Sequence, residues 1–331
     1  MADRFKLSRR GLLQGGAAAL ALGTGAGVGA GAGRALAAAD MQGTQVPGYY
    51  RFMLGAFEIT VLSDGSYELP TDLIGQNQPR ETVQAYLEAH FLDPERRTSH
   101  VNIPLINTGE ELILIDVGGG GNFLEGAGKL VENMEAAGYA PDEVDKVFIT
   151  HAHPDHLWGL LDDFDDPMFP EAEFFISAPE WDFWSSETAA EQVPEMFQSF
   201  AAGAQRRLPL IEDVLTRTAD GDTIAPGISV IDTPGHTPGH SSVRVESEGE
   251  TLIVTADAMT HPFISFEHPG WWPGTDLDPA KAEASRRMVL EMAATERATI
   301  LAYHLSFPGL GNVARAGAAY RFVPALWRWQ L

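Results

Sequence analysis

Ten consecutive residues carry the densest chemistry in this chain: Thr150-His151-Ala152-His153-Pro154-Asp155-His156-Leu157-Trp158-Gly159. Three imidazoles and one carboxylate lie within six of these residues, although the whole chain holds only ten histidines. The residues just before them, 147–149, are apolar and favour a strand, so the cluster is expected where a buried strand ends. Imidazole is the commonest metal ligand, and a carboxylate joins it where a harder charge is needed. The stretch therefore predicts a metal site rather than a polar surface turn.

Other apolar segments of the chain also end in aspartate or histidine. Residues 111–116 and 251–257 are similar runs that each end in an aspartate, Asp116 and Asp257, and residues 299–303 lead directly into a histidine. The similarity of the first two runs hints at two related halves that face one another. These strand ends are expected to meet the histidine cluster.

A further strand, residues 228–232, leads into the segment Thr233-Pro234-Gly235-His236-Thr237-Pro238-Gly239-His240. By local sequence, His236 and His240 are equally good ligand candidates. Two catalytic zinc sites need about six protein ligands, or about seven when a carboxylate bridges the ions. The strand ends offer a matching set of side chains: His151, His153, Asp155, His156, His240, Asp257 and His304.

Composition narrows the classes of protein that this chain can belong to. Its 331 residues are 44% hydrophobic, which is enough for a sizeable core. Lys and Arg number 22 against 46 Asp and Glu, and the resulting net charge of −24 argues against a nucleic-acid partner. Because the chain has no cysteine, any metal must be held by histidine and carboxylate, which favours zinc, iron, manganese or cobalt.

The N-terminal residues have the composition of an export signal. Arg9 and Arg10 precede a Gly/Ala-rich run over residues 15–33, and Ala37 fits an Ala-x-Ala cleavage site. We expect residues 1–37 to be a twin-arginine-type signal peptide, with the export machinery as a partner and a periplasmic or secreted location. The alternatives are a flexible linker and a membrane anchor, and the many glycines disfavour a spanning helix.

Strand and helix patterns alternate after the signal, which predicts α/β layers in a single domain over residues 38–331. Helices are expected over 82–90, 130–137, 179–186, 194–207 and 279–294, and the rest of 70–100 reads as irregular. Strands are expected over 49–54, 57–62, 102–107, 112–117, 146–150, 173–177, 228–232, 243–246, 252–256 and, as the last strand, 299–303.

The ordered metal-ligand pattern resembles the metallo-β-lactamase superfamily. The pattern consists of His151-x-His153-x-Asp155-His156, the Pro-Gly-His-x-Pro-Gly-His segment, Asp257 and a late histidine, and it covers the chain after the signal. Within the superfamily the chain looks most like the methyl parathion hydrolase-like metallohydrolases, in residues 47–55, 57–60, 62–65, 304–309 and 320–324. This resemblance implies a four-layer αββα sandwich with a dinuclear metal site at one edge of the sheets.

The resemblance also implies a role for each ligand of two divalent metal ions, zinc before cobalt, manganese or iron. One ion would take three histidines: His151, His153 and His240. The other would take a carboxylate and two histidines: Asp155, His156 and His304. Asp257 would bridge the ions, Asp116 would orient a ligand, and His236 would be a structural loop residue. The carboxylates with catalytic roles would be Asp257, Asp155 and Asp116.

Two positions depart from the family pattern. Trp158 stands where the family often has glycine, so its bulk either reshapes one wall of the site or packs in the core. Lactonases of the superfamily carry a tyrosine three residues after the bridging aspartate, and this chain has Thr260 there. This difference weakens the lactonase interpretation.

The function that the resemblance implies is hydrolysis of small neutral esters by a metal-bridging hydroxide. Aryl phosphotriesters such as methyl parathion, aryl esters and lactones are the candidate substrates, and Phe123, Trp184 and Phe200 resemble the aromatic residues of the family's pocket. A lactonase or β-lactamase-type hydrolase is the alternative within the superfamily. A non-haem iron redox protein of the same fold is the alternative from another class. A homodimer is compatible with the sequence.

Overall fold

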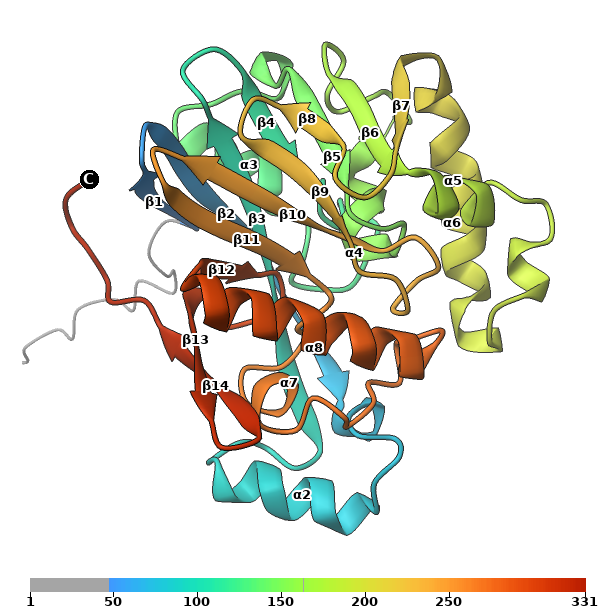
Figure 1. The fold of residues 1–331 in the computed structure, drawn as a ribbon. Coiled ribbons are helices and arrows are strands. Elements are labelled where there is room, and N and C mark those ends of the chain that lie inside the picture. Colours follow the sequence, from blue (N-terminus) through green and yellow to red (C-terminus); the bar gives the residue numbers. More distant parts are fainter. Residues whose placement is uncertain (1–47, 163) are drawn as a thin grey trace, which may run out of the picture. The chain divides into compact units, whose positions relative to one another are not determined.

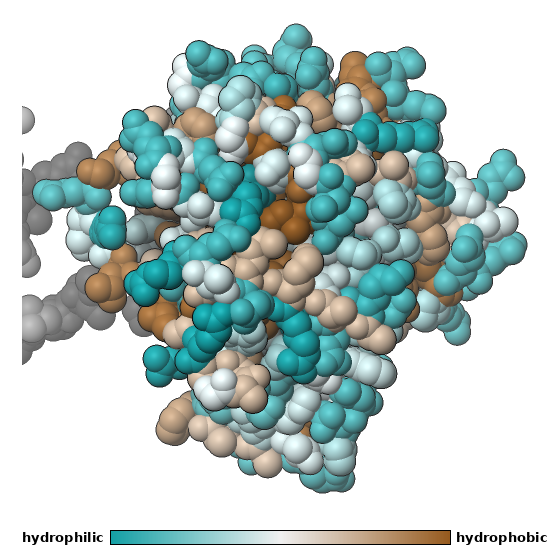
Figure 2. All heavy atoms as spheres, viewed as in Figure 1, coloured by the Kyte–Doolittle hydropathy of each residue, from teal (hydrophilic) through white to brown (hydrophobic). Residues whose placement is uncertain are grey.

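The structure of the chain is a computed structural model that describes residues 48–162 and 164–331. The expected signal peptide, residues 1–37, lies outside the described residues and stays a prediction. Within the described part of the chain, no helix is both long and apolar enough to cross a membrane. The face drawn in Figure 2 is mostly hydrophilic, in keeping with the net charge of −24.

Two seven-stranded sheets form the centre of the fold (Figure 1). The first has its strands in sequence order: β1 (Tyr49–Leu54), β2 (Phe57–Pro70), β3 (Arg96–Asn107), β4 (Leu112–Ile115), β5 (Lys146–Ile149), β6 (Glu173–Ser177) and β7 (Leu215–Thr218). Strands β1 to β4 pair antiparallel, and β4 to β7 pair parallel.

The second sheet also follows the sequence order, and only its β11–β12 pair is parallel. Its strands are β8 (Thr223–Ala225), β9 (Ile228–Asp232), β10 (Ser241–Ser247), β11 (Glu250–Ala256), β12 (Thr299–Ala302), β13 (Leu310–Ala316) and β14 (Ala319–Pro324). The helices are α2 (Arg80–Ala89), α3 (Leu130–Ala136), α4 (Pro154–Leu157), α5 (Ala178–Trp184), α6 (Gln198–Arg207), α7 (Ile264–Glu267) and α8 (Pro279–Glu296).

Three apolar clusters divide these elements into four layers. Ile113 and Phe148 of the first sheet pack with Val243 and Val254 of the second in the middle cluster. The outer face of the first sheet packs against α3, α4, α5 and α6, and that of the second packs against α8. Each sheet is therefore apolar on both faces, as sheets covered by helices are. The predicted αββα sandwich is confirmed.

Two strands run further than the sequence predicts. We expected strands over 57–62 and 102–107, but β2 continues to Pro70 and β3 begins at Arg96. The pairing passes a bulge between Ser63 and Gly65, where Gly65 has a φ of +104° that an L side chain rarely adopts. The extra residues form a two-stranded ribbon, residues 65–70 paired with 96–101, which we call the β2–β3 ribbon.

The prediction that residues 299–303 form the last strand is wrong. The hairpin β13–β14 follows them and completes the edge of the second sheet. The short strands β7 and β8 were also not expected. Helix α8 begins as its sequence predicts, because Pro279 occupies the first turn and the Asp278 side chain accepts a hydrogen bond from Lys281 N at 3.1 Å.

Candidate metal centre

The ends of β5, β9, β11 and β12 bring seven histidine and aspartate side chains together. β5 delivers the loop and short helix that carry the histidine cluster, while the other three strands precede His236, Asp257 and His304. All seven side chains are buried, with 6% or less of their surface exposed: His151, His153, Asp155, His156, His236, Asp257 and His304. Such a density of buried polar groups requires partners, because each would otherwise lose its hydration without compensation.

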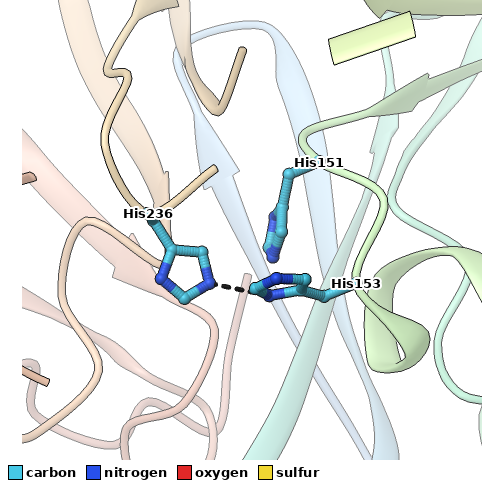
Figure 3. A group of neighbouring side chains, drawn as sticks. All are labelled: His151, His153 and His236. Carbon is cyan, nitrogen blue, oxygen red and sulfur yellow. Dashed lines mark hydrogen bonds between the residues drawn. The ribbon is translucent and has the colours of Figure 1, made fainter. Parts of the chain in front are cut away.

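Their ligand atoms fall into three overlapping groups, each with all atoms within 4.8 Å of one another. The groups are His151, His153 and His236; His151, His156 and Asp257; and Asp155, His156 and His304. Figure 3 shows the first group, with the three imidazoles turned toward one another from the loops that follow β5 and β9.

The Asp257 carboxylate lies between the two sides of this centre. Its Oδ1 is 3.1 Å from both His156 Nε2 and His304 Nε2, and its Oδ2 is 3.2 Å from His236 Nε2. On the far side, His304 Nε2 is 3.4 Å from Asp155 Oδ2. A carboxylate with one oxygen toward each group has the arrangement that a bridging ligand needs.

Several of these atoms lie close to one another but make no hydrogen bond. Within the part of the chain that the structure describes, His151 Nε2, His156 Nε2 and Asp257 Oδ1 are buried without a hydrogen bond. A buried unsatisfied polar atom lowers the free energy of unfolding by roughly 1–3 kcal/mol, so several of them at one point indicate a functional role such as ion binding. Imidazole nitrogens and carboxylate oxygens at this point fit a metal of the zinc, iron or cobalt type.

Hydrogen bonds behind the imidazoles fix which nitrogen faces inward. His156 Nδ1 lies 2.8 Å from Asp116 Oδ2, and Asp116 also accepts hydrogen bonds from the amide and hydroxyl of Thr150 at 2.7 and 2.8 Å. His304 Nδ1 lies 2.8 Å from the carbonyl oxygen of His100. Asp116 therefore sits where an acid that orients a metal-binding histidine is expected.

The structure reverses the roles expected of His236 and His240. Both ring nitrogens of His240 have protein partners, because Nδ1 lies 3.0 Å from Thr233 O and Nε2 accepts a hydrogen bond from Asp257 N at 3.1 Å. His236 instead places Nε2 2.9 Å from His153 Nδ1, and its Nδ1 is held 2.9 Å from Asp276 Oδ1. The expectation that His240 is the ligand is corrected, since it has no ring nitrogen left for a metal.

Burial sets the charge of the ligand candidates. It lowers the pKa of His151 and His153 well below the usual value, so both imidazoles stay neutral and keep a lone pair for a metal. Burial opposes ionisation of Asp257, but the imidazoles of His304 and His156 outweigh it and hold the pKa of Asp257 well below its usual value. The centre thus combines the neutral imidazoles of His151 and His153 with a charged carboxylate, whereas nearby carboxylates outweigh burial and raise the pKa of His156 and His236.

Sequence reasoning missed Glu180, which joins the two ligand loops. This fully buried carboxylate accepts hydrogen bonds from Ala152 N at 2.8 Å and Trp184 Nε1 at 2.7 Å on one oxygen. Its other oxygen accepts from Thr237 Oγ1 at 2.7 Å and Gly239 N at 2.9 Å. Glu180 therefore holds the loop of His151 and His153 against the loop of His236.

We expect Glu180→Gln to destabilise the protein and weaken zinc binding. The amide NH₂ has to face one of the two donor pairs, which leaves a buried N–H or O–H unsatisfied at a cost of about 1–3 kcal/mol. Loss of such an outer contact also lowers metal affinity by about 10–100-fold. Denaturant unfolding and zinc competition with a chelator measure both effects. The exposed Glu187→Gln is the control, and equal behaviour of the two variants would contradict this role for Glu180.

Two of the three aromatic residues expected in the pocket are half-buried, and the third, Trp184, is fully buried. The Trp184 ring centroid lies 5.8 Å from that of His153 and its indole N–H donates to Glu180, so its place in a substrate pocket stays a prediction. Phe123 and Phe200 are half-buried beside the centre, with ring centroids 5.1 Å from Tyr67 and 5.3 Å from His153. A cavity of about 500 Å³ reaches His304 from the side of the β2–β3 ribbon.

Trp158 packs against helix α6. A Cβ on Gly203 would lie 2.5 Å from Trp158 Cε2, and the Arg207 guanidinium is 4.9 Å from the indole centroid. Gly203 of α6, which has no side chain, therefore leaves the space that the Trp158 ring occupies. Of the two outcomes expected for Trp158, packing is the one observed.

Comparison with known proteins agrees with this fold and centre. The family model of the metallo-beta-lactamase superfamily matches residues 96–304. N-acyl homoserine lactonase AiiA from Bacillus thuringiensis subsp. kurstaki is 24% identical over 229 residues, which cover 62% of this chain and 82% of the relative.

Two solved structures are similar over most of their length. The dizinc quorum-quenching lactonase AidC, in complex with N-hexanoyl-L-homoserine as product, has a TM-score of 0.79 and 29% identity, covering 85% of this chain and 98% of its own. The hydrolase AbOPH of the beta lactamase superfamily has a TM-score of 0.80 and 31% identity, covering 86% of this chain and 100% of its own. The chain therefore belongs to the metallo-β-lactamase superfamily, as one of its metal-dependent hydrolases.

Proposed function

We propose that the protein is a dinuclear metal-dependent lactonase, with other esters as secondary substrates. The observation that carries the proposal is the Asp257 carboxylate, with one oxygen toward His236 and the other toward His156 and His304. The lactone preference is supported by the relatives, since AiiA and AidC are both lactonases.

Each metal would be held by three side chains besides the shared Asp257. We assign three histidines to the first ion: His151, His153 and His236. We assign a carboxylate and two histidines to the second: Asp155, His156 and His304. Zinc is the proposed metal, because AidC is a dizinc enzyme and the ligands are imidazoles and carboxylates. When bound, two such ions would supply a water acidified to a pKa of about 7 and would polarise the ester carbonyl.

The protein's own groups position this chemistry. Tyr67 of the β2–β3 ribbon donates its hydroxyl to Asp155 Oδ2 at 2.6 Å, which orients that carboxylate. Burial, reinforced by the Asp155 charge, holds the pKa of Tyr67 well above its usual value, so the phenol stays protonated. At the position where lactonases carry a tyrosine, the Thr260 amide donates instead to Ser265 Oγ at 3.1 Å. Tyr67 thus brings a phenol to the centre from the β2–β3 ribbon, and Tyr303, which follows β12, brings a second one that donates to the Asp155 carbonyl oxygen at 2.7 Å.

Hydrolysis of aryl phosphotriesters is the second candidate function. It is favoured by the resemblance of several stretches to methyl parathion hydrolase-like enzymes and by the half-buried rings of Phe123 and Phe200 beside the centre. Its support is weaker, because Trp184, the third aromatic residue expected in the pocket, is fully buried.

A substrate panel separates the two candidates. We expect the zinc-loaded protein to open an N-acylated γ-lactone with kcat/KM in the ordinary enzyme range, about 10⁴ M⁻¹s⁻¹ or more. An aryl phosphotriester, an aryl acetate and a cephalosporin should be hydrolysed more slowly. Rapid turnover of the phosphotriester or the cephalosporin with an inert lactone would refute the lactonase proposal.

A further inference from the structure

The β2–β3 ribbon turns one of its faces toward the metal centre. Tyr67 and Ser99 are cross-strand partners in it, and both contact the centre: Tyr67 through Asp155, and Ser99 Oγ at 3.0 Å from His304 Nδ1. Side chains two residues apart on a strand share a face. Arg97 therefore lies on the same face as Ser99, next along β3.

The Arg97 guanidinium is mostly without partners. Within the described residues, it makes one hydrogen bond, from Nη1 to the Thr260 carbonyl oxygen at 2.8 Å. Its Nε is buried and has no acceptor. Since a guanidinium has five N–H donors and cannot lose its charge in a protein, the Nη donors that do not bond Thr260 remain free for a ligand. Thr260 stands where lactonases carry a tyrosine, and its backbone carbonyl oxygen here accepts a hydrogen bond from Arg97.

Arg97 and His304 line the same cavity of about 500 Å³, together with an apolar wall that includes Leu87 and Leu92. A ligand in this cavity can therefore contact the metal-binding histidine and the guanidinium at once.

Two carboxylates also line this cavity, and both already have donors. Glu68 Oε1 accepts from Thr98 Oγ1 at 2.6 Å. Asp93 Oδ1 accepts from the amides of Glu95 and Arg96 at 2.8 and 3.1 Å. These acids do not occupy Arg97, whose fork of donors matches a carboxylate in a bidentate arrangement.

We propose that this cavity is a substrate subsite in which Arg97 binds a carboxylate carried by the acyl part of the ester or lactone. The inference rests on the proposed function, because it places the scissile bond at the metal centre. Within each class of ester or lactone, it favours substrates that carry such a carboxylate over their neutral counterparts, and it makes Arg97 a specificity-determining residue. A simpler role, balancing the charges of Asp155 and Asp257, would make Arg97 necessary for metal binding but not for carboxylate recognition.

Calorimetric binding of two five-carbon acids to the zinc-loaded protein tests the subsite without catalysis. Glutarate carries a second carboxylate and pentanoate does not. We expect glutarate to bind about 10-fold tighter or more, as fits a charge-assisted hydrogen-bonded pair in a half-buried site. Arg97→Met should bind the two acids equally while zinc content stays unchanged, and Arg97→Lys should keep only part of the preference. Arg321→Met, at an exposed residue of β14, makes the same charge change and should behave as wild type.

Three outcomes would overturn the subsite: equal binding of both acids by the wild type, a glutarate preference that survives in Arg97→Met, or zinc loss in Arg97→Met. Hydrolysis of monophenyl glutarate and phenyl pentanoate separates this inference from the proposed function. If neither ester nor any lactone is hydrolysed while glutarate binding depends on Arg97, the lactonase proposal fails and the subsite stands. If both esters are hydrolysed with equal KM, the subsite fails and the hydrolase stands.

Discussion

Replacing Asp257 with alanine is expected to lower kcat/KM for lactone hydrolysis by about 10³-fold or more, because the variant loses several kcal/mol of metal-assisted stabilisation. Asp257 is the one carboxylate among the described residues that faces both sides of the centre. Without it, Asp155 still lies beside His156 and His304, but no carboxylate joins these two imidazoles to His236. We therefore also expect zinc content to fall, as measured by elemental analysis.

Asp278→Ala is the matched control for this prediction. Asp278 caps α8 from the surface, so its loss should cost about 0.5–2 kcal/mol of stability and leave zinc and activity unchanged. If Asp257→Ala retains two zinc ions and near-wild-type activity, the bridging role is wrong.

Replacing His236 with alanine is expected to remove the first zinc ion, whereas His240→Ala is expected to keep both ions and lower the stability of the fold. His236 places a ring nitrogen among His153 and Asp257, and it is held from behind by Asp276, which in turn accepts from Arg286 Nη2 at 3.1 Å. His240 uses both nitrogens within the protein. Elemental analysis and thermal unfolding of the two variants measure the difference.

The pair serves as its own control, because the same substitution is made four residues apart in one loop. Zinc loss from His240→Ala with full occupancy in His236→Ala would restore the assignment expected from the resemblance. Equal zinc loss in both variants would show that the loop as a whole, rather than one histidine, determines binding.

The choice between these histidines depends on tertiary packing that the sequence does not contain. Both follow a Pro-Gly pair, so their local sequences are nearly identical. The two glycines differ in what they touch: a Cβ on Gly235 would meet the backbone of Ala282 in α8, and one on Gly239 would meet Glu180 in α5. The helices against which the loop packs decide which imidazole enters the centre.

The strand ends that form the centre were predictable for a simpler reason. Apolar runs that stop at His or Asp mark strand boundaries, and strands of packed sheets end near one another. This places the cluster at 151–156, Asp257 and His304 correctly. An apolar run that ends at His or Asp locates the end of a strand from local sequence alone. It does not require knowledge of how the loops pack together.

The β2–β3 ribbon was not predicted, because residues 63–65 favour a turn but do not end the strand. Ser63-Asp64-Gly65 reads as the end of a strand, but the Asp64 carboxylate accepts hydrogen bonds from Gly119 N at 2.9 Å and Leu130 N at 2.8 Å. Because Asp64 is tied to distant backbone, the strand passes through a bulge and continues. Tyr67 and Arg97 lie beyond that bulge, so the sequence offered no signal for either.

Anomalous diffraction from crystals of the zinc-loaded protein tests the dinuclear centre most directly. We expect two zinc peaks about 3.5–4 Å apart, with the Asp257 carboxylate between them. One peak should lie against His151, His153 and His236, and the other against Asp155, His156 and His304. A single peak in a fully active enzyme would contradict the dinuclear centre. A peak bound to His240, with His236 free, would contradict the ligand assignment.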